Sequence, residues 1–175
     1  MTNPNNAVGT NGALGGRTSV NAFNDNLAIY ASRGIVSGWT VSPSSNMTVS
    51  VGGVSGTRDV AIAADVSGNK TTVNNISGQP ISVTLAAAPS VNSRIDAIVA
   101  YVQNPATVSV TTLDNPSACG IISVSGTVAS SPVQPTDSVI RAAITADGAA
   151  GATAYYVIIS KIKIATGTTT ITSSL

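Results

Sequence analysis

The sequence has no histidine, no glutamate and a single cysteine, Cys119, among its 175 residues. Without histidine, the chain cannot form a Ser/His/Asp or Cys/His catalytic arrangement or a Cys/His zinc site. A single thiol also excludes an intramolecular disulfide. We therefore expect no enzymatic activity and no cofactor. Because Cys119 precedes Gly120 and two isoleucines, we expect its side chain to be a small buried one.

Charged residues are scarce as well, at 9% of the chain against about 25% in an ordinary soluble domain. The net charge of +1 gives no electrostatic reason to expect a nucleic acid or a membrane as partner. Aromatic residues, at 3%, are too few for a platform that stacks on single-stranded nucleic acid. The surface must depend on serine, threonine and asparagine, and this composition indicates a component of a protein assembly.

Long apolar runs are missing too. No stretch of about 18 apolar residues is present, so we expect no membrane-spanning helix. The first residues lack the basic start and apolar centre of a secretory signal, and we expect none. The sequence ends at Leu175, in or just after a predicted strand, which leaves open that it is the ordered part of a longer fibre protein.

Serine, threonine, valine and glycine are abundant, and this balance favours a β-rich fold with many turns. The most strand-like run is residues 93–102, SRIDAIVAYV, which is apolar on both faces after its first residues. The pattern predicts a central strand that is covered on both sides. Arg94 and Asp96 stand two apart at its start and therefore share a face.

From residue 38 onward, apolar and polar residues mostly alternate, and turn residues interrupt the pattern every 8–12 residues or so. This spacing predicts about ten strands in an antiparallel β-sandwich or jelly-roll-like domain, residues 34–175. Besides 93–102, the expected strands are residues 39–41, 47–51, 58–63, 71–74, 81–85, 108–112, 120–125, 154–164 and 168–172.

The predicted strand at 154–164 ends in the sequence KIKI. Strict alternation places Ile158, Ile162 and Ile164 on one face of this strand. The same alternation places Lys161 and Lys163 on the opposite face. One short helix is expected before this strand, near residues 136–146. Thr136 or Asp137 can cap its start, and Gly148 can end it. Its apolar side is predicted to consist of Val139, Ile140, Ala143 and Ile144.

Residues 1–33 are predicted to form an extended docking arm followed by a helix. The first 18 residues are mostly Asn, Gly, Thr and Ala, and such a segment does not order alone in water. Thr18 or Ser19 can then cap a helix whose apolar residues recur at spacings of three and four, with Gly34 as its stop. We expect this helix to pack on the domain's own sheet or against symmetry mates. The predicted interface residues are Val8, Leu14, Val20, Phe23, Leu27 and Tyr30.

Candidate catalytic groups find little support. The seven acidic residues are all aspartates and are scattered, so nothing indicates a pair that converges in a cleft. Residues 65–69, DVSGN, resemble part of a calcium loop but lack the downstream acid, which favours a plain Asx turn. Arg58, Asp59, Arg94 and Asp96 are predicted to form a structural ion-pair network at one end of the sheet, with Arg94 bonded to Asp59 or Asp96.

Several longer segments carry a family resemblance. Residues 34–102 contain a Gly-Trp start, then RDVAIA, then TVNNISGQPISVTLAAAPSVNSRIDAIVAYV. The later run YYVIISKIKIATGTTTIT is similar to a closing hairpin. Together they resemble the N-terminal β-rich attachment domain of tailed-phage fibre proteins, a group that includes head-fibre proteins and baseplate or tail-fibre adaptors. The resemblance covers about residues 34–175, and its motifs are structural rather than catalytic.

The resemblance implies a homotrimeric virion protein that is assembled in the host cytoplasm. We expect first the base of a head fibre or a capsid decoration protein, bound to the major capsid protein through its N-terminal arm. Second comes a tail or baseplate fibre adaptor or the anchor of a receptor-binding protein. A carbohydrate-binding module or carbohydrate-active enzyme on the same fold is the remote alternative.

Overall fold

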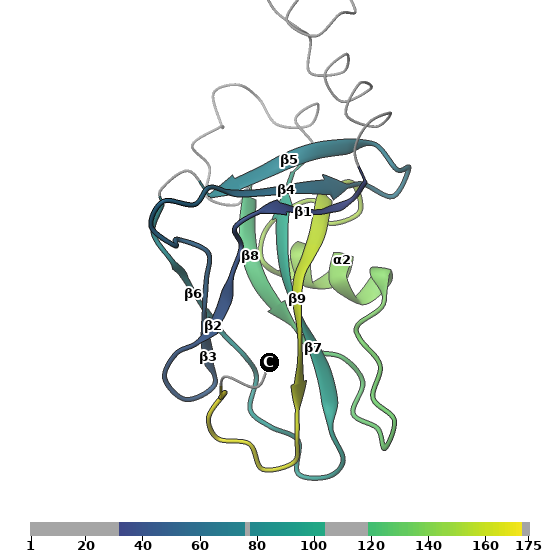
Figure 1. Cartoon of the computed structure of the whole chain (residues 1–175). Coiled ribbons are helices and arrows are strands. Elements are labelled where there is room, and N and C mark those ends of the chain that lie inside the picture. The colour runs from purple at the N-terminus through teal and green to yellow at the C-terminus, as the bar shows by residue number, and fades with distance from the viewer. Residues whose placement is uncertain (1–31, 76–77, 104–118, 173–175) are drawn as a thin grey trace, which may run out of the picture.

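The computed structural model describes residues 32–75, 78–103 and 119–172 (Figure 1). This part of the chain is mainly β, as predicted, and its sheets are antiparallel. The strands are β1 (Gly34–Ser37), β2 (Val41–Pro43), β3 (Thr48–Val51), β4 (Asp59–Ala64), β5 (Lys70–Asn75), β6 (Ile81–Thr84), β7 (Arg94–Val102), β8 (Cys119–Val124) and β9 (Tyr155–Ile164). The helix among the described residues is α2 (Asp137–Ala146).

Several sequence-based predictions fall outside the described residues. The docking arm and the first helix lie there, with Val8, Leu14, Val20, Phe23, Leu27 and Tyr30. The expected strand at 108–112 lies there too. Gly34, the expected stop of the first helix, is the first residue of β1.

The strands form a larger and a smaller sheet. The larger sheet has six strands in the order β1-β4-β9-β7-β8, with β5 on the free edge of β4. The smaller sheet has three, in the order β2-β3-β6. In Figure 1, β1, β4 and β5 run across one end of β7, β8 and β9, while the smaller sheet and α2 lie on opposite sides of these long strands. The predicted central strand, β7, lies between β9 and β8.

Side chains of β7 show that the larger sheet is covered on both faces. Ile98 and Ala100 point toward the smaller sheet and join a core that includes valines of β3 and β6. Ala97, Val99 and Tyr101 point toward α2 and join a second core that contains its isoleucines. All five side chains are buried, so the prediction of a strand covered on both sides is confirmed.

Strand β9 departs from the alternation that the sequence predicts. Its register with β7 passes from Ile98↔Ser160 to Val99↔Ile158, which leaves Ile159 as an extra residue on β9. An extra residue on one strand of an antiparallel pair is a β-bulge, and it reverses the facing of every later residue on that strand.

The expected grouping of the β9 isoleucines is therefore wrong. Ile162 and Ile164 lie in the core between the two sheets, whereas Ile158 packs against the core under α2. Lys161 pairs with Ala97, whose side chain faces α2, so Lys161 and Lys163 share a face with Ile158. Both lysines are exposed because α2 does not cover that end of the strand.

Helix α2 has the predicted limits but a narrower buried face. It begins after Thr136, and Ile140 and Ile144 are buried as expected. Val139 is 44% exposed and does not belong to the apolar side. The Thr136 hydroxyl contacts the hydroxyl of Ser138 at 3.0 Å and makes no hydrogen bond to a helix N–H.

The segment after β9 is not a strand, contrary to prediction. Residues 168–172 have no strand pairing. The backbone N–H of Ile171 donates to the carbonyl of Asn46 at 2.9 Å, and the Ile171 side chain is buried in the core between the sheets. The segment thus returns to the turn between β2 and β3 and does not extend along β9.

Candidate functional site

Two of the four predicted ion-pair residues meet at the start of β7. The Arg94 guanidinium donates to both carboxylate oxygens of Asp96, with Nε 2.8 Å from Oδ1 and 3.1 Å from Oδ2. It also donates to the carbonyls of Ala86 and Ala87, while the N–H of Gly126 donates to Asp96. The side chains of Arg94 and Asp96 are 7% and 0% exposed. This buried pair therefore fastens two loops to the strand, which is a structural role.

Asp59 belongs to a different cluster. Its carboxylate accepts hydrogen bonds from the N–H groups of Trp39 and Gly53, both at 2.7 Å, and from the Asn75 amide at 3.0 Å. Asp59 is 2% exposed, whereas Arg58 is exposed. Among the described residues no ion pair joins Arg58 to Asp59, so the four predicted residues do not form one network.

Two tyrosines, which the sequence reasoning missed, fasten α2 to the sheet. Tyr101 of β7 donates to Asp147, just after the helix, at 2.5 Å, and Tyr156 of β9 donates to Asp137, its first residue, at 2.6 Å. The tyrosines are direct cross-strand neighbours. Burial, with these hydrogen bonds, raises the pKa of both phenols, and the bond from Tyr156 lowers the pKa of Asp137.

The candidate interaction site lies where β9 stops pairing with β4 and stays in the larger sheet through β7. β9 meets β4 at one register pair, Ala64↔Tyr156. β1 pairs with the neighbouring residues on the same edge of β4, and its first residue, Gly34, lies opposite Ile62. If β9 had continued to pair with β4, Ile158 would lie opposite Ile62. β1 therefore displaces β9, and in the described part of the chain β9 has no strand on this edge beyond Tyr156.

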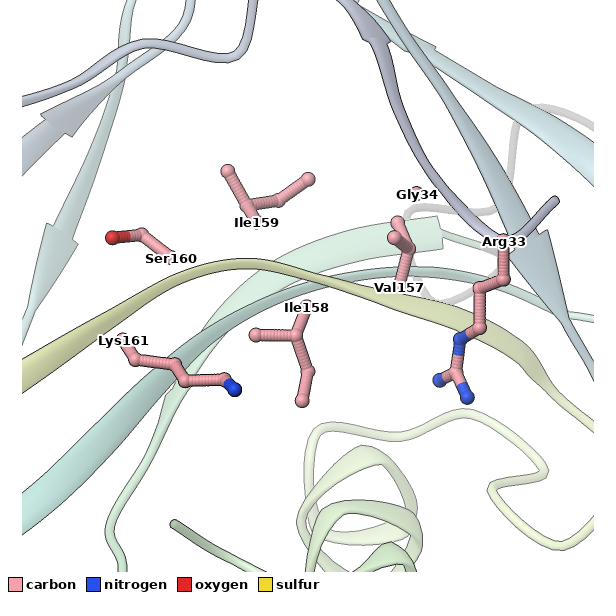
Figure 2. Close-up of a pocket in the computed structure, with 7 residues that line it drawn as sticks. All are labelled: Arg33, Gly34, Val157, Ile158, Ile159, Ser160 and Lys161. Carbon is pink, nitrogen blue, oxygen red and sulfur yellow. The ribbon is translucent and has the colours of Figure 1, made fainter.

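A cavity of about 510 Å³ fills the gap between β1 and β9. Arg33 and Gly34 line one side of it, and residues 157–161 of β9 line the other. Figure 2 shows the side chains of Ile158 and Lys161 on the same side of the β9 ribbon as Arg33. We call this cavity, together with the unpaired edge of β9 from 158 to 164, the β9 groove.

The β9 groove is cationic. Arg33 lies over the ring of Tyr156, with Cζ 3.8 Å from the ring centroid. Lys161 and Lys163 are exposed, and neither has an ion-pair partner among the described residues. An unpaired strand edge offers backbone donors and acceptors to another extended segment, and lysines on an edge discourage uncontrolled pairing. The arrangement can thus bind a chain, and its charge restricts which chain.

Two further predictions can be placed. Cys119 is exposed, so the expected buried thiol is wrong: its position at the start of an edge strand leaves it uncovered beside a cavity of about 320 Å³ that Trp39 and Ile121 also line. Asp65 accepts hydrogen bonds from the N–H groups of Ser67 and Asn69, both at 2.9 Å, which is the predicted Asx turn.

Within the described ranges, no three acidic or cysteine side chains come together in a group that could hold a metal ion. None of the helices described there is long and apolar enough to cross a membrane. Comparisons with protein-family models, with curated proteins and with solved structures found no match to this chain.

Proposed function

We propose that the protein is a non-enzymatic structural protein of a bacteriophage virion, the base of a head fibre or a capsid decoration protein. In this proposal the described sheets form a β-sandwich attachment domain, and residues 1–33 dock it on the major capsid protein. The phage assignment rests on the sequence resemblance. Support for an attachment role comes separately, from the β9 groove.

The β9 groove is the observation that favours an attachment role. An open strand edge is a binding surface whose affinity comes from main-chain hydrogen bonds and whose specificity comes from flanking side chains. Buried polar clusters at Asp59 and at Asp96 hold together the sheets that carry the groove. Arg33 and Gly34 line the groove, so the described part of the chain begins at this surface.

A tail or baseplate fibre adaptor is the alternative within the same class, because an attachment domain serves equally well there. Imaging of virions that carry a labelled copy separates the two locations. A carbohydrate-binding module has less support: Trp39, Tyr101, Tyr155 and Tyr156 are all buried, so in the described part of the chain these aromatic rings are not displayed for stacking on a sugar.

The proposed docking is tested by deleting residues 1–18 and, as a matched control, by scrambling the order of the same residues. We expect the deleted chain to keep its β domain, measured by circular dichroism, but to be absent from purified particles. The scrambled arm should fail to incorporate as well if a specific sequence docks. The full chain is expected to sediment as a trimer. Sedimentation as a monomer, together with incorporation of the deleted chain, contradicts the proposal.

A further inference from the structure

We propose that the β9 groove binds an extended segment of another protein, and that this segment carries two carboxylate side chains two residues apart. The bound segment adds a strand along β9 after the bulge, beside residues 160–164. The chemistry that recognises it combines main-chain hydrogen bonds with ion pairs to Lys161 and Lys163. The inference does not depend on the virion assignment.

The geometry of β9 supports a strand as the occupant. The strand pairs with β7 along its full length, so its backbone is held extended and its other edge is fixed in position. Beyond Tyr156, no strand in the described ranges covers that edge. The chain after β9 turns away to Asn46, where the Ile171 N–H bonds. The backbone N–H and C=O groups on this edge of β9 are therefore already positioned to pair with an added strand, and binding requires little further ordering of β9.

The two lysines determine the charge of the occupant. Lys161 and Lys163 stand two apart on one face, so residues two apart on an added strand lie directly opposite them. A second copy of β9 on this edge would bring lysines close to lysines, and like charges in that position are unfavourable. Carboxylates at the same spacing on a partner strand would pair with both.

No segment within these 175 residues carries such an acidic pair, so the proposed occupant comes from outside them. The seven acidic residues of this chain are Asp25, Asp59, Asp65, Asp96, Asp114, Asp137 and Asp147, and no two of them stand two residues apart. The cavity adds one further preference. Ile158 and Ile159 line it beside Arg33, so an apolar residue that precedes or follows the acidic pair has an apolar surface to cover.

Binding is tested with terminally blocked peptides of about eight residues in which valine and aspartate alternate, a length that spans one strand. The matched control has lysine in place of aspartate, and a second control has alternate backbone nitrogens of the acidic peptide methylated. We expect the acidic peptide to shift the NMR signals of residues 157–164. Because two cross-strand pairs turn from attractive to repulsive, the lysine peptide should bind about tenfold more weakly. The methylated peptide should bind more weakly still, since it cannot form the main-chain ladder.

Charge reversal provides the decisive variant. The Lys161→Glu/Lys163→Glu protein should prefer the lysine peptide over the aspartate peptide. Lys161→Glu alone should weaken binding of the acidic peptide more than Arg58→Glu does, an equal charge change at an exposed residue that does not line the groove. Equal binding of both peptides, an unchanged preference in the double variant, or no shift at β9 up to about 1 mM peptide overturns the inference. If the chain binds acidic strands but never enters a virion, the inference about the groove stands and the proposed function is wrong.

Discussion

Strands β7 and β9 are neighbours in one sheet and are both long and rich in isoleucine and valine, yet they differ in what surrounds them. β7 has a strand on each edge and a packed core on each face. β9 has β7 on one edge, while its other edge is unpaired beyond Tyr156 in the described structure. The comparison indicates that burial of side chains and closure of backbone edges are separate properties, and that only β7 has both.

Substitution of Val99 by aspartate should show the largest difference between the strands. Val99 is 0% exposed under α2, and a carboxylate there has no partner, so we expect the free energy of unfolding to fall by more than about 4 kcal/mol and folding to fail. Lys161→Asp on β9 is the matched control and should change stability by less than about 0.5 kcal/mol. Chemical denaturation measures both, and a soluble Val99→Asp protein with an unchanged midpoint would place the core elsewhere.

The charged residues of the strands should differ next. Asp96→Ala leaves the buried Arg94 guanidinium without its counter-ion, which costs about 3–5 kcal/mol. Lys163→Ala removes an exposed charge from β9 and should cost almost nothing. If urea denaturation gave the same small loss of stability for both variants, the pair at the start of β7 would not clamp the two loops to the strand.

The two tyrosines test how evenly α2 is held by the strands. Tyr101→Phe on β7 removes a bond to Asp147, an exposed residue that water can then solvate, so we expect a loss of about 1.5 kcal/mol. Tyr156→Phe should cost slightly less, because Asp137 keeps its bond to Arg141. Thermal unfolding measures each bond in a double-mutant cycle, with Tyr101→Phe also made in an Asp147→Asn background and Tyr156→Phe in an Asp137→Asn background. If the two losses of a cycle add, the hydrogen bond between that tyrosine and that aspartate contributes nothing to stability.

The smallest expected effect is a dependence on acidic pH. The bond from Tyr156 lowers the pKa of Asp137, so the ionised carboxylate stabilises the fold above its unfolded pKa of about 3.9. That contribution is lost as the pH falls through the lower, folded value. Because the Asp137 side chain is 54% exposed, we expect less than about 1 kcal/mol. The stability gap between the natural chain and Asp137→Asn should narrow from about pH 5 to about pH 2.5, and a constant gap would contradict this.

Much of the fold could be predicted from local patterns. The run at 93–102 is apolar at every position after Asp96, and this pattern correctly predicted a strand with two covered faces. The limits of α2 followed from Thr136 and Gly148, because both residues have strong preferences at helix ends. Such signals are local in sequence. The structure keeps the predicted limits of the helix, although the Thr136 hydroxyl contacts Ser138 and makes no capping hydrogen bond.

The β9 groove could not be predicted in the same way. Residues 157–159 are Val, Ile and Ile, so the sequence fits a bulge as well as it fits regular alternation. The displacement of β9 by β1 depends on two segments more than 100 residues apart. The bond from Tyr101 to Asp147 spans 46 positions and leaves no local signal. The lysines of KIKI were the available indication, since alternating lysines on a strand are typical of an edge.

Amide hydrogen exchange along β7 and β9 distinguishes an open edge of β9 from a paired one, because exchange reports whether each N–H is hydrogen-bonded and protected. With an open edge on β9, alternate amides from 158 to 164 should exchange quickly while those between them, which face β7, exchange slowly. Amides of β7 that pair with β8 and β9 should all exchange slowly. Uniform protection along β9 in the full chain would contradict the account, because it would mean that the edge is already paired.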